Sequence, residues 1–253
     1  MPELIKIKVT PEEDIKLHSS MGSVLHGAIM THLPSQIAED LHNISLRPFS
    51  QALIPKNNGT EGEWRIGFLD DYYSSFIRDM LSSMSELHLT HKNSSIKLSD
   101  FQIIKKESYE EIADGIFTCD NVPKSADIFI NTAMSFKHDG QYINFPYMSA
   151  IYNSLMNKWN SFAGNIQFSE DDLANRLGQM TVLGRYQLSS RTFSVEGRNI
   201  NGFAGNMRLL FRGNEMPKKV MASLIKLAPY SGIGIKTALG MGNCNSEIIF
   251  NNK

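Results

Sequence analysis

Seven histidines provide most of the acid–base chemistry that this 253-residue sequence offers near neutral pH. Histidine takes or gives a proton at pH 7 without help, so it suits a reaction that needs a proton acceptor and a proton donor. No C-x-x-C, H-E-x-x-H or G-x-S-x-G pattern is present, and we expect neither a metal site nor a cofactor. The histidines occupy positions 18, 26, 32, 42, 88, 91 and 138.

His42 and His26 are the histidines whose neighbours suggest a role. His42 ends a short predicted helix, and Arg47 follows five residues later at the start of a predicted strand. An arginine there can hold a phosphate through two hydrogen bonds, but a histidine at a helix C-terminus is also stabilised by the helix dipole alone. The spacing fits a catalytic and a structural role for His42 equally well. His26, beside Gly27 on the preceding predicted helix, fits simple packing too.

The segment Pro229–Asn243, PYSGIGIKTALGMGN, has glycines dense enough to form an anion-binding loop. Glycine adopts positive φ angles at little cost and lets backbone N–H groups approach an anion closely. The order G-x-G-x-K-T differs from the nucleotide-binding G-x-x-x-x-G-K-[ST] pattern, which excludes a P-loop. Two alternatives remain: a grip on a phosphate backbone, or the end of a helix before a last strand.

Charge is distributed unevenly, although the net charge is only −1. Residues 1–157 have 13 basic and 20 acidic side chains, whereas residues 158–236 have 11 basic and 5 acidic ones. This segregation favours a polyanion partner for the second half, with a merely solvated basic face as the alternative.

The sequence also indicates where the protein works. No apolar run reaches the roughly 18 residues that a membrane span requires, and the N-terminus lacks the apolar region of a signal peptide. Two cysteines, Cys119 and Cys244, are too few for a disulfide framework. We therefore expect a cytoplasmic protein without membrane contact.

The elements that must position these residues form two similar series. In the first half, periodicity predicts a first strand, two helices with Ser35 as an N-cap, two strands, a long helix and a last strand. The predicted ranges are Leu4–Val9, Ser23–Leu33, Pro34–His42, Ser45–Ile54, Glu63–Leu69, Tyr72–Leu87 and Ile96–Ile104. The order β-α-β-β-α-β is typical of the ferredoxin-like arrangement.

The second half repeats this order with a hairpin across His138–Gly140. The expected helix Pro217–Ala228 has Pro217 near its first position and must stop at Pro229. The other predicted elements are Asp127–Asn131, Met148–Phe162, Met180–Val195, Gly202–Arg212 and Glu247–Phe250. We therefore predict an α+β protein of two tandem ferredoxin-like (βαββαβ) domains, residues 1–120 and 121–253.

Five sequence motifs stand out along the chain: GSVLHG at 22–27, DLH at 40–42, RPF at 47–49, SFK…YINFP within 135–146 and SGIGIKTALGMG at 231–242. They resemble motifs of the CRISPR precursor-RNA processing endoribonucleases, which belong to the RAMP superfamily. The similarity is greatest to the members that accompany type III-A systems. The resemblance covers nearly the whole chain.

This resemblance implies metal-independent cleavage within the CRISPR repeat. The 2′-hydroxyl attacks its own 3′ phosphate, leaving a 2′,3′-cyclic phosphate and a 5′-hydroxyl. His42 occupies the place of the family's histidine, and Arg47 falls where many members have a lysine that stabilises charge. The tyrosine of some members aligns near Met30, which transfers no proton, so His26 is expected to take that part.

The resemblance also implies that the glycine motif meets the partner, CRISPR repeat RNA or precursor crRNA. These residues are Gly232, Gly234, Lys236, Thr237, Gly240 and Gly242. The charge balance adds the basic segment Lys158–Arg212, with Arg191 and Arg208, as further RNA contacts. Transient contact with a type III-A effector complex is expected, and exposed apolar residues allow a homodimer. The alternatives are a non-catalytic RNA-binding subunit of a CRISPR effector complex and an unrelated α+β protein whose loop binds a small anion.

Overall fold

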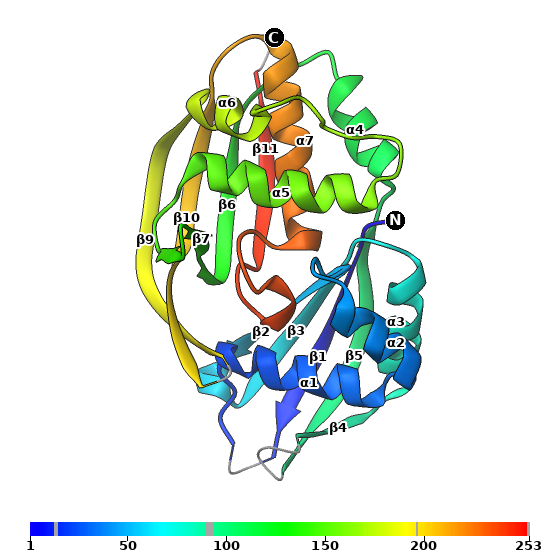
Figure 1. Cartoon of the computed structure of the whole chain (residues 1–253). Coiled ribbons are helices and arrows are strands. Elements are labelled where there is room, and N and C mark those ends of the chain that lie inside the picture. The colour runs from blue at the N-terminus through cyan, green and yellow to red at the C-terminus, as the bar shows by residue number, and fades with distance from the viewer. Residues whose placement is uncertain (13–14, 90–93, 196, 252–253) are drawn as a thin grey trace.

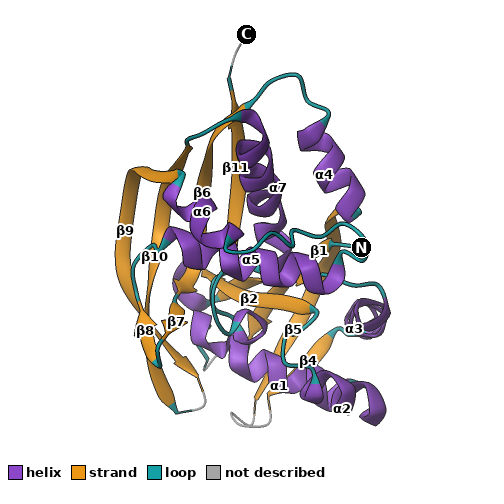
Figure 2. Ribbon diagram, turned by 45° about the horizontal axis from the view of Figure 1, so that its top comes forward, coloured by secondary structure: helices purple, strands orange, loops and turns teal. Residues whose placement is uncertain are grey.

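Two antiparallel sheets, each backed by helices on one face, make up the computed structural model (Figures 1 and 2). The described residues are 1–12, 15–89, 94–195 and 197–251. Each sheet has its own buried cluster of mainly aliphatic side chains between its strands and its helices. Among the described residues, no helix is long and apolar enough to cross a membrane.

The first sheet has the strand order β2-β3-β1-β5-β4. Without its edge strand β4, this is the order of a ferredoxin-like domain, as the sequence predicts. Phe49 faces Phe68 across β2 and β3, and Ile5 faces Ile66 across β1 and β3, so apolar residues meet on the helix-covered face. Its elements are β1 (Glu3–Pro11), α1 (Gly22–His32), α2 (Ser35–Asn43), β2 (Phe49–Lys56), β3 (Glu61–Phe68), α3 (Tyr72–Ser83), β4 (Glu86–Leu89) and β5 (Ser94–Lys106).

Several details of the first half differ from the predictions, including the strand expected from Ser45, which begins only at Phe49. The N-cap of α2 is Pro34 rather than Ser35, which is the first helical residue. The helix expected over Tyr72–Leu87 ends at Ser83, because Met84 turns to extended angles of φ −93° and ψ 131°. Leu87 is buried from the strand β4 instead, where Leu87 and Leu89 alternate with exposed residues. The helical spacing of Leu87 was therefore a coincidence with the period-two pattern of a strand.

The second sheet has the order β11-β6-β10-β9, again ferredoxin-like, and the hairpin β7–β8 is inserted after β6. The prediction of a turn at His138–Gly140 and of a helix over Met148–Phe162 is confirmed, whereas α4 and α6 were not predicted. The elements are α4 (Tyr109–Phe117), β6 (Pro123–Met134), β7 (Phe136–His138), β8 (Gln141–Ile143), α5 (Met148–Phe162), α6 (Leu173–Gln179), β9 (Thr181–Val195), β10 (Arg198–Phe211), α7 (Glu215–Ser231) and β11 (Cys244–Phe250).

Helix α7 continues past Pro229, so the expectation that this proline ends the helix was wrong. Proline has no N–H to donate to the carbonyl four residues earlier, that of Ile225. The hydroxyl of Ser246 on β11 donates to that carbonyl instead, at 2.9 Å. The helix ends only at Gly232, whose φ is +61°. Pro217 is the third helical residue rather than the first, since α7 begins at Glu215.

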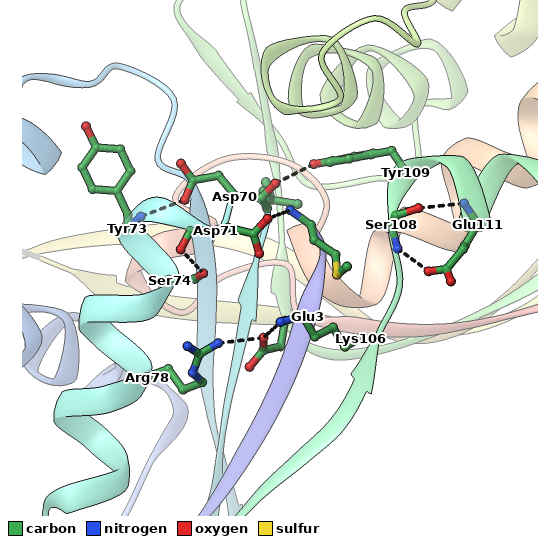
Figure 3. A network of polar contacts seen from close by, with 12 residues as sticks. Glu3, Asp70, Asp71, Tyr73, Ser74, Arg78, Lys106, Ser108, Tyr109 and Glu111 are labelled. Carbon is green, nitrogen blue, oxygen red and sulfur yellow. Dashed lines mark hydrogen bonds and ion pairs between the residues drawn. The ribbon is translucent and has the colours of Figure 1, made fainter.

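Polar contacts fix the start of β1 and of α4 (Figure 3). The Glu3 carboxylate is buried and pairs with Arg78 of α3 at 3.1 Å and with Lys106 of β5 at 3.3 Å. Ser108 and Glu111 form a capping box at the start of α4. The two ion pairs of Glu3 offset part of the desolvation of its carboxylate.

Candidate functional site

The connection between α2 and β2 brings Arg47 against His42. His42 lies in the last turn of α2 with an exposed side chain, and one guanidinium nitrogen of Arg47 donates to its carbonyl oxygen at 3.1 Å. Partial burial lowers the pKa of the Arg47 guanidinium, which nevertheless stays charged. The result is a cation held at a helix end beside an accessible imidazole, a combination suited to a phosphate.

His26 lies near the same strand from the other side. It is a half-buried residue of α1, and its ring stacks on that of Phe49, the first residue of β2, with centroids 5.7 Å apart and planes 19° apart. Phe49 comes two residues after Arg47. The structure thus places Arg47 and His26 at the same end of β2, as the sequence had suggested only through family resemblance.

Gln51, two residues further along β2, connects α1 with the glycine-rich loop, by which we mean residues 232–243. Its amide nitrogen donates to the carbonyl of Gly22 at 2.5 Å and to that of Ala238 at 3.0 Å. Its amide oxygen accepts a hydrogen bond from the Trp64 indole at 2.8 Å, and the group is buried. Gln51 is therefore fully satisfied and fixes three segments to one another.

The glycine-rich loop lies between α5 and α1 and between the two sheets (Figure 1). All four glycine amides donate within the chain: Gly232 to Ala228 O, Gly234 to Ser154 Oγ, Gly240 to Thr237 O and Gly242 to Ala133 O, at 2.8–3.4 Å. Amides bonded in this way offer no free donor to a phosphate. Contact of these four glycines with RNA stays a prediction, and the hydrogen bonds give their amides a different use.

Backbone conformation explains why glycine is needed here. Gly242 has a φ of +66°, and a Cβ atom at this position would overlap the carbonyl oxygen of Ile233. The loop is therefore folded tightly on itself and against its neighbours.

Lys236 and Thr237 are adjacent, but their side chains differ in solvent exposure. Lys236 is partly exposed and has a φ of +53°, at the start of a short 3-10 helix, Thr237–Leu239. Thr237 is buried, and its hydroxyl accepts a hydrogen bond from Lys158 at 3.2 Å. The Thr237 side chain thus points into the protein rather than to a ligand.

The two arginines predicted to bind RNA lie on the second sheet in different settings. Arg208 makes a bidentate ion pair with Asp127, its register partner on β6, at 2.6 and 2.5 Å, and this pair raises the pKa of Arg208. Arg191 is exposed on β9, three residues from Ser194, whose amide donates to Ser20 just before α1. Arg191 is therefore the arginine nearer to α1, while the charge of Arg208 is already compensated.

The other described histidines form no metal centre. No group of three or more His, Cys, Asp or Glu side chains that could hold a metal ion occurs in the described ranges. His32 lies 2.8 Å from the carbonyl of Ala28 on its own helix, and His138 pairs with Asp139 at 3.3 Å on the β7–β8 turn. His91 lies outside the described residues.

Gln51 was missed in the sequence, and Lys158 was considered only as the first residue of the basic segment expected to contact RNA, although it is buried. Both are polar residues at positions where the local pattern is apolar. Gln51 follows Ser50 within the buried run of β2, and Lys158 falls on the buried stripe of α5 with Ile151 and Leu155. A polar side chain on a buried stripe is the signal that could have identified them.

Comparison with known proteins points to one family. The profile of the family described as "CRISPR-associated endoribonuclease Cas6" matches residues 128–244, which include the glycine-rich loop. The Cas6 endoribonuclease of Streptococcus thermophilus is 28% identical over 222 residues, 88% of this chain and 89% of that protein. The product complex of Thermus thermophilus Cas6 superposes with a TM-score of 0.81 at 21% identity over 98% of this chain and 100% of that one. Another structure of that protein gives 0.75 at 20% identity, covering 98% of each chain.

Proposed function

We propose that this chain, a CRISPR-associated endoribonuclease similar to Cas6, cleaves within the repeat of precursor crRNA by 2′-hydroxyl attack. In this step the 2′-oxygen bonds to the adjacent phosphorus while the bond from phosphorus to the 5′-oxygen breaks. A base takes the proton of the 2′-hydroxyl, and an acid gives a proton to the leaving 5′-oxygen. The products are a 2′,3′-cyclic phosphate and a 5′-hydroxyl.

The observation that carries this proposal is the contact of Arg47 with the end of α2. A partly buried guanidinium beside an exposed His42 provides a cation for the phosphate and a group that transfers protons. We assign His42 as an acid–base residue, Arg47 as the group that stabilises charge on the phosphorane, and His26 as the second proton-transfer group. The stacking of the His26 ring on Phe49 supports this role for His26, because the stacking holds the imidazole at the end of β2 that follows Arg47.

CRISPR repeat RNA is the partner of this site, and we propose Lys236 and Arg191 as its phosphate contacts. Both are partly or fully exposed cations beside the segments that surround the start of α1. Their contribution is electrostatic and should weaken with salt. Association with a type III-A effector complex, a homodimer, a cytoplasmic location and a domain division between residues 120 and 121 stay predictions.

The test is cleavage of the cognate repeat RNA in excess EDTA, with and without a 2′-deoxy substitution at the cleavage position. We expect cleavage of the ribose substrate with EDTA present and none of the 2′-deoxy substrate. His88→Ala serves as a matched control for His42→Ala, because His88 is an exposed histidine on β4. Cleavage of the 2′-deoxy RNA, or a strict requirement for added metal, would contradict the mechanism.

A further inference from the structure

Lys158 is a lysine buried within the protein that the proposed reaction does not use. It lies on α5 with 3% of its surface exposed. Its ammonium donates to the carbonyls of Ser231 and Gly232 at 2.7 and 2.9 Å and to the hydroxyl of Thr237 at 3.2 Å. Three N–H donors thus meet three oxygen atoms, which offsets part of the desolvation of the charge.

The three acceptors belong to one structural feature, the passage from α7 into the glycine-rich loop. Ser231 is the last residue of α7, where carbonyls lack partners within the helix and the helix dipole is negative. Lys158 satisfies these carbonyls from another helix. One turn earlier on α5, Ser154 accepts the hydrogen bond of the Gly234 amide at 2.8 Å. Helix α5 therefore makes four hydrogen bonds to the segment 231–237, three through Lys158 and one through Ser154.

The other side of the loop touches the start of α1. A Cβ atom added to Gly22 would lie 2.7 Å from the carbonyl oxygen of Leu239 and 2.9 Å from the Cα of Gly240, so backbone packs directly on backbone. Gln51 ties Gly22 and Ala238 together by donating to both carbonyls. Displacement of the loop must therefore displace the first residue of α1, one turn before His26.

We propose that Lys158 is a positioning residue for RNA cleavage: it fixes the glycine-rich loop, and the loop fixes the first turn of α1, the helix that carries His26. The inference rests on the proposed function in one respect, the role of His26. It predicts that the loss of Lys158 lowers the rate of the chemical step more than it lowers RNA affinity, because RNA does not touch this buried side chain.

The test compares Lys158→Met with Lys219→Met in the full chain. Lys219 is also a lysine buried on a helix, donating to the Phe117 carbonyl at 2.9 Å, but it lies at the opposite end of α7 from the loop. Single-turnover cleavage of repeat RNA at saturating protein gives the rate of the chemical step, and RNA titration gives Kd. We expect Lys158→Met to lower the rate about 10–100-fold with a change in Kd below about threefold, since small displacements in an active site have effects of this size. Lys219→Met should leave both unchanged at a similar loss of Tm.

Equal losses of rate in the two variants, or an unchanged rate in Lys158→Met, would overturn the proposal. If Lys158→Met does not fold, Ser154→Ala decides, because it removes only the acceptor of the Gly234 amide. A slower chemical step at unchanged Kd supports the inference, and an unchanged rate overturns it. Failure of the cleavage mechanism would appear separately, as cleavage of 2′-deoxy RNA by the unmutated protein.

Discussion

The glycine-rich loop and the connection between α2 and β2 are opposites in how they are held. In the loop, the glycine amides are bonded internally and α5, β2, β6 and α1 surround the backbone. At the α2–β2 connection, His42 is exposed and Arg47 makes a hydrogen bond to a carbonyl at a helix end. The segment with the most recognisable sequence is therefore internal, while His42, which we propose as an acid–base residue, lies on the accessible segment.

This difference suggests a division of work. We infer that the glycine-rich loop is a scaffold that orients α1 against the second sheet, whereas chemistry takes place at the α2–β2 connection and at His26. The comparison predicts that substitutions in the glycine-rich loop mainly lower stability, whereas substitutions at the α2–β2 connection lower activity without a loss of stability.

The largest expected effect is that of His42→Ala on cleavage. Loss of a general acid or base typically lowers a rate by about 10²–10⁴-fold, and an exposed side chain contributes little to folding. Single-turnover kinetics should show this loss at an unchanged Tm, with His88→Ala active. A His42→Ala variant that cleaves normally would contradict the claim that acid–base chemistry takes place at the α2–β2 connection.

Gly242→Ala, in contrast, should act on stability and destabilise the fold by about 4 kcal/mol. Alanine would have to adopt a left-handed backbone conformation, and its Cβ atom would overlap the Ile233 carbonyl. Gly140→Ala is the matched control, because Gly140 has a φ of +79° but open space around it. It should lose only about 1 kcal/mol. Urea unfolding measures both, and equal losses would show that the loop is not tightly enclosed.

Gln51→Leu sharpens the comparison at the point where its two regions meet. It leaves two buried carbonyls, of Gly22 and Ala238, and the Trp64 indole without their partner, which we expect to cost about 3 kcal/mol. Gln102→Leu on β5, an exposed site, should be nearly neutral in the same urea titration. An unchanged free energy of unfolding in Gln51→Leu would mean that the hydrogen bonds of Gln51 contribute nothing to stability.

The stability of the loop should depend on pH through Lys158. Burial lowers the pKa of this lysine from 10.5 to about 7. Between these values the unfolded chain binds a proton that the folded chain lacks, so the stability contribution rises with pH. From pH 7 to 8.5 the gain is at most about 2 kcal/mol. Urea unfolding should show this rise in the unmutated protein and not in Lys158→Met. The same dependence of unfolding free energy on pH in both proteins would contradict the role of Lys158.

The smallest expected effect concerns RNA affinity. Arg191→Ala should reduce the slope of log Kd against log salt by about 0.7, the value for one lost contact to a single strand. Arg208→Ala should leave the slope nearly unchanged, because Asp127 already holds that guanidinium. Filter binding across salt concentrations measures both, and a larger effect of Arg208 would reverse their assignment.

Much of the fold follows from local pattern, and the wrong predictions fall where tertiary contacts decide the structure. Period-two and period-3.6 patterns predicted both ferredoxin-like series. The patterns could not show that Leu87 belongs to an edge strand, since its pairing with Ile96 is a tertiary contact. Nor could they show that Ser246, seventeen residues beyond Pro229, would supply the missing donor and let α7 continue.

The site was predictable only in part for the same reason. The sequence placed His42 and Arg47 close together, because they are five residues apart, and the structure shows the contact. The burial of Lys158 and Thr237 depends on three segments meeting, which spacing does not encode. A glycine-rich segment therefore looked like an exposed grip, although its amides are used internally.

Hydrogen exchange of peptides that cover residues 229–243 tests the scaffold role of the loop most directly. It would be measured in the free protein and with 2′-deoxy repeat RNA bound. Because their amides already donate within the chain, Gly232, Gly234, Gly240 and Gly242 should exchange slowly in the free protein, and RNA should change this little. Fast exchange in the free protein that becomes slow on RNA binding would contradict the scaffold and restore the phosphate grip.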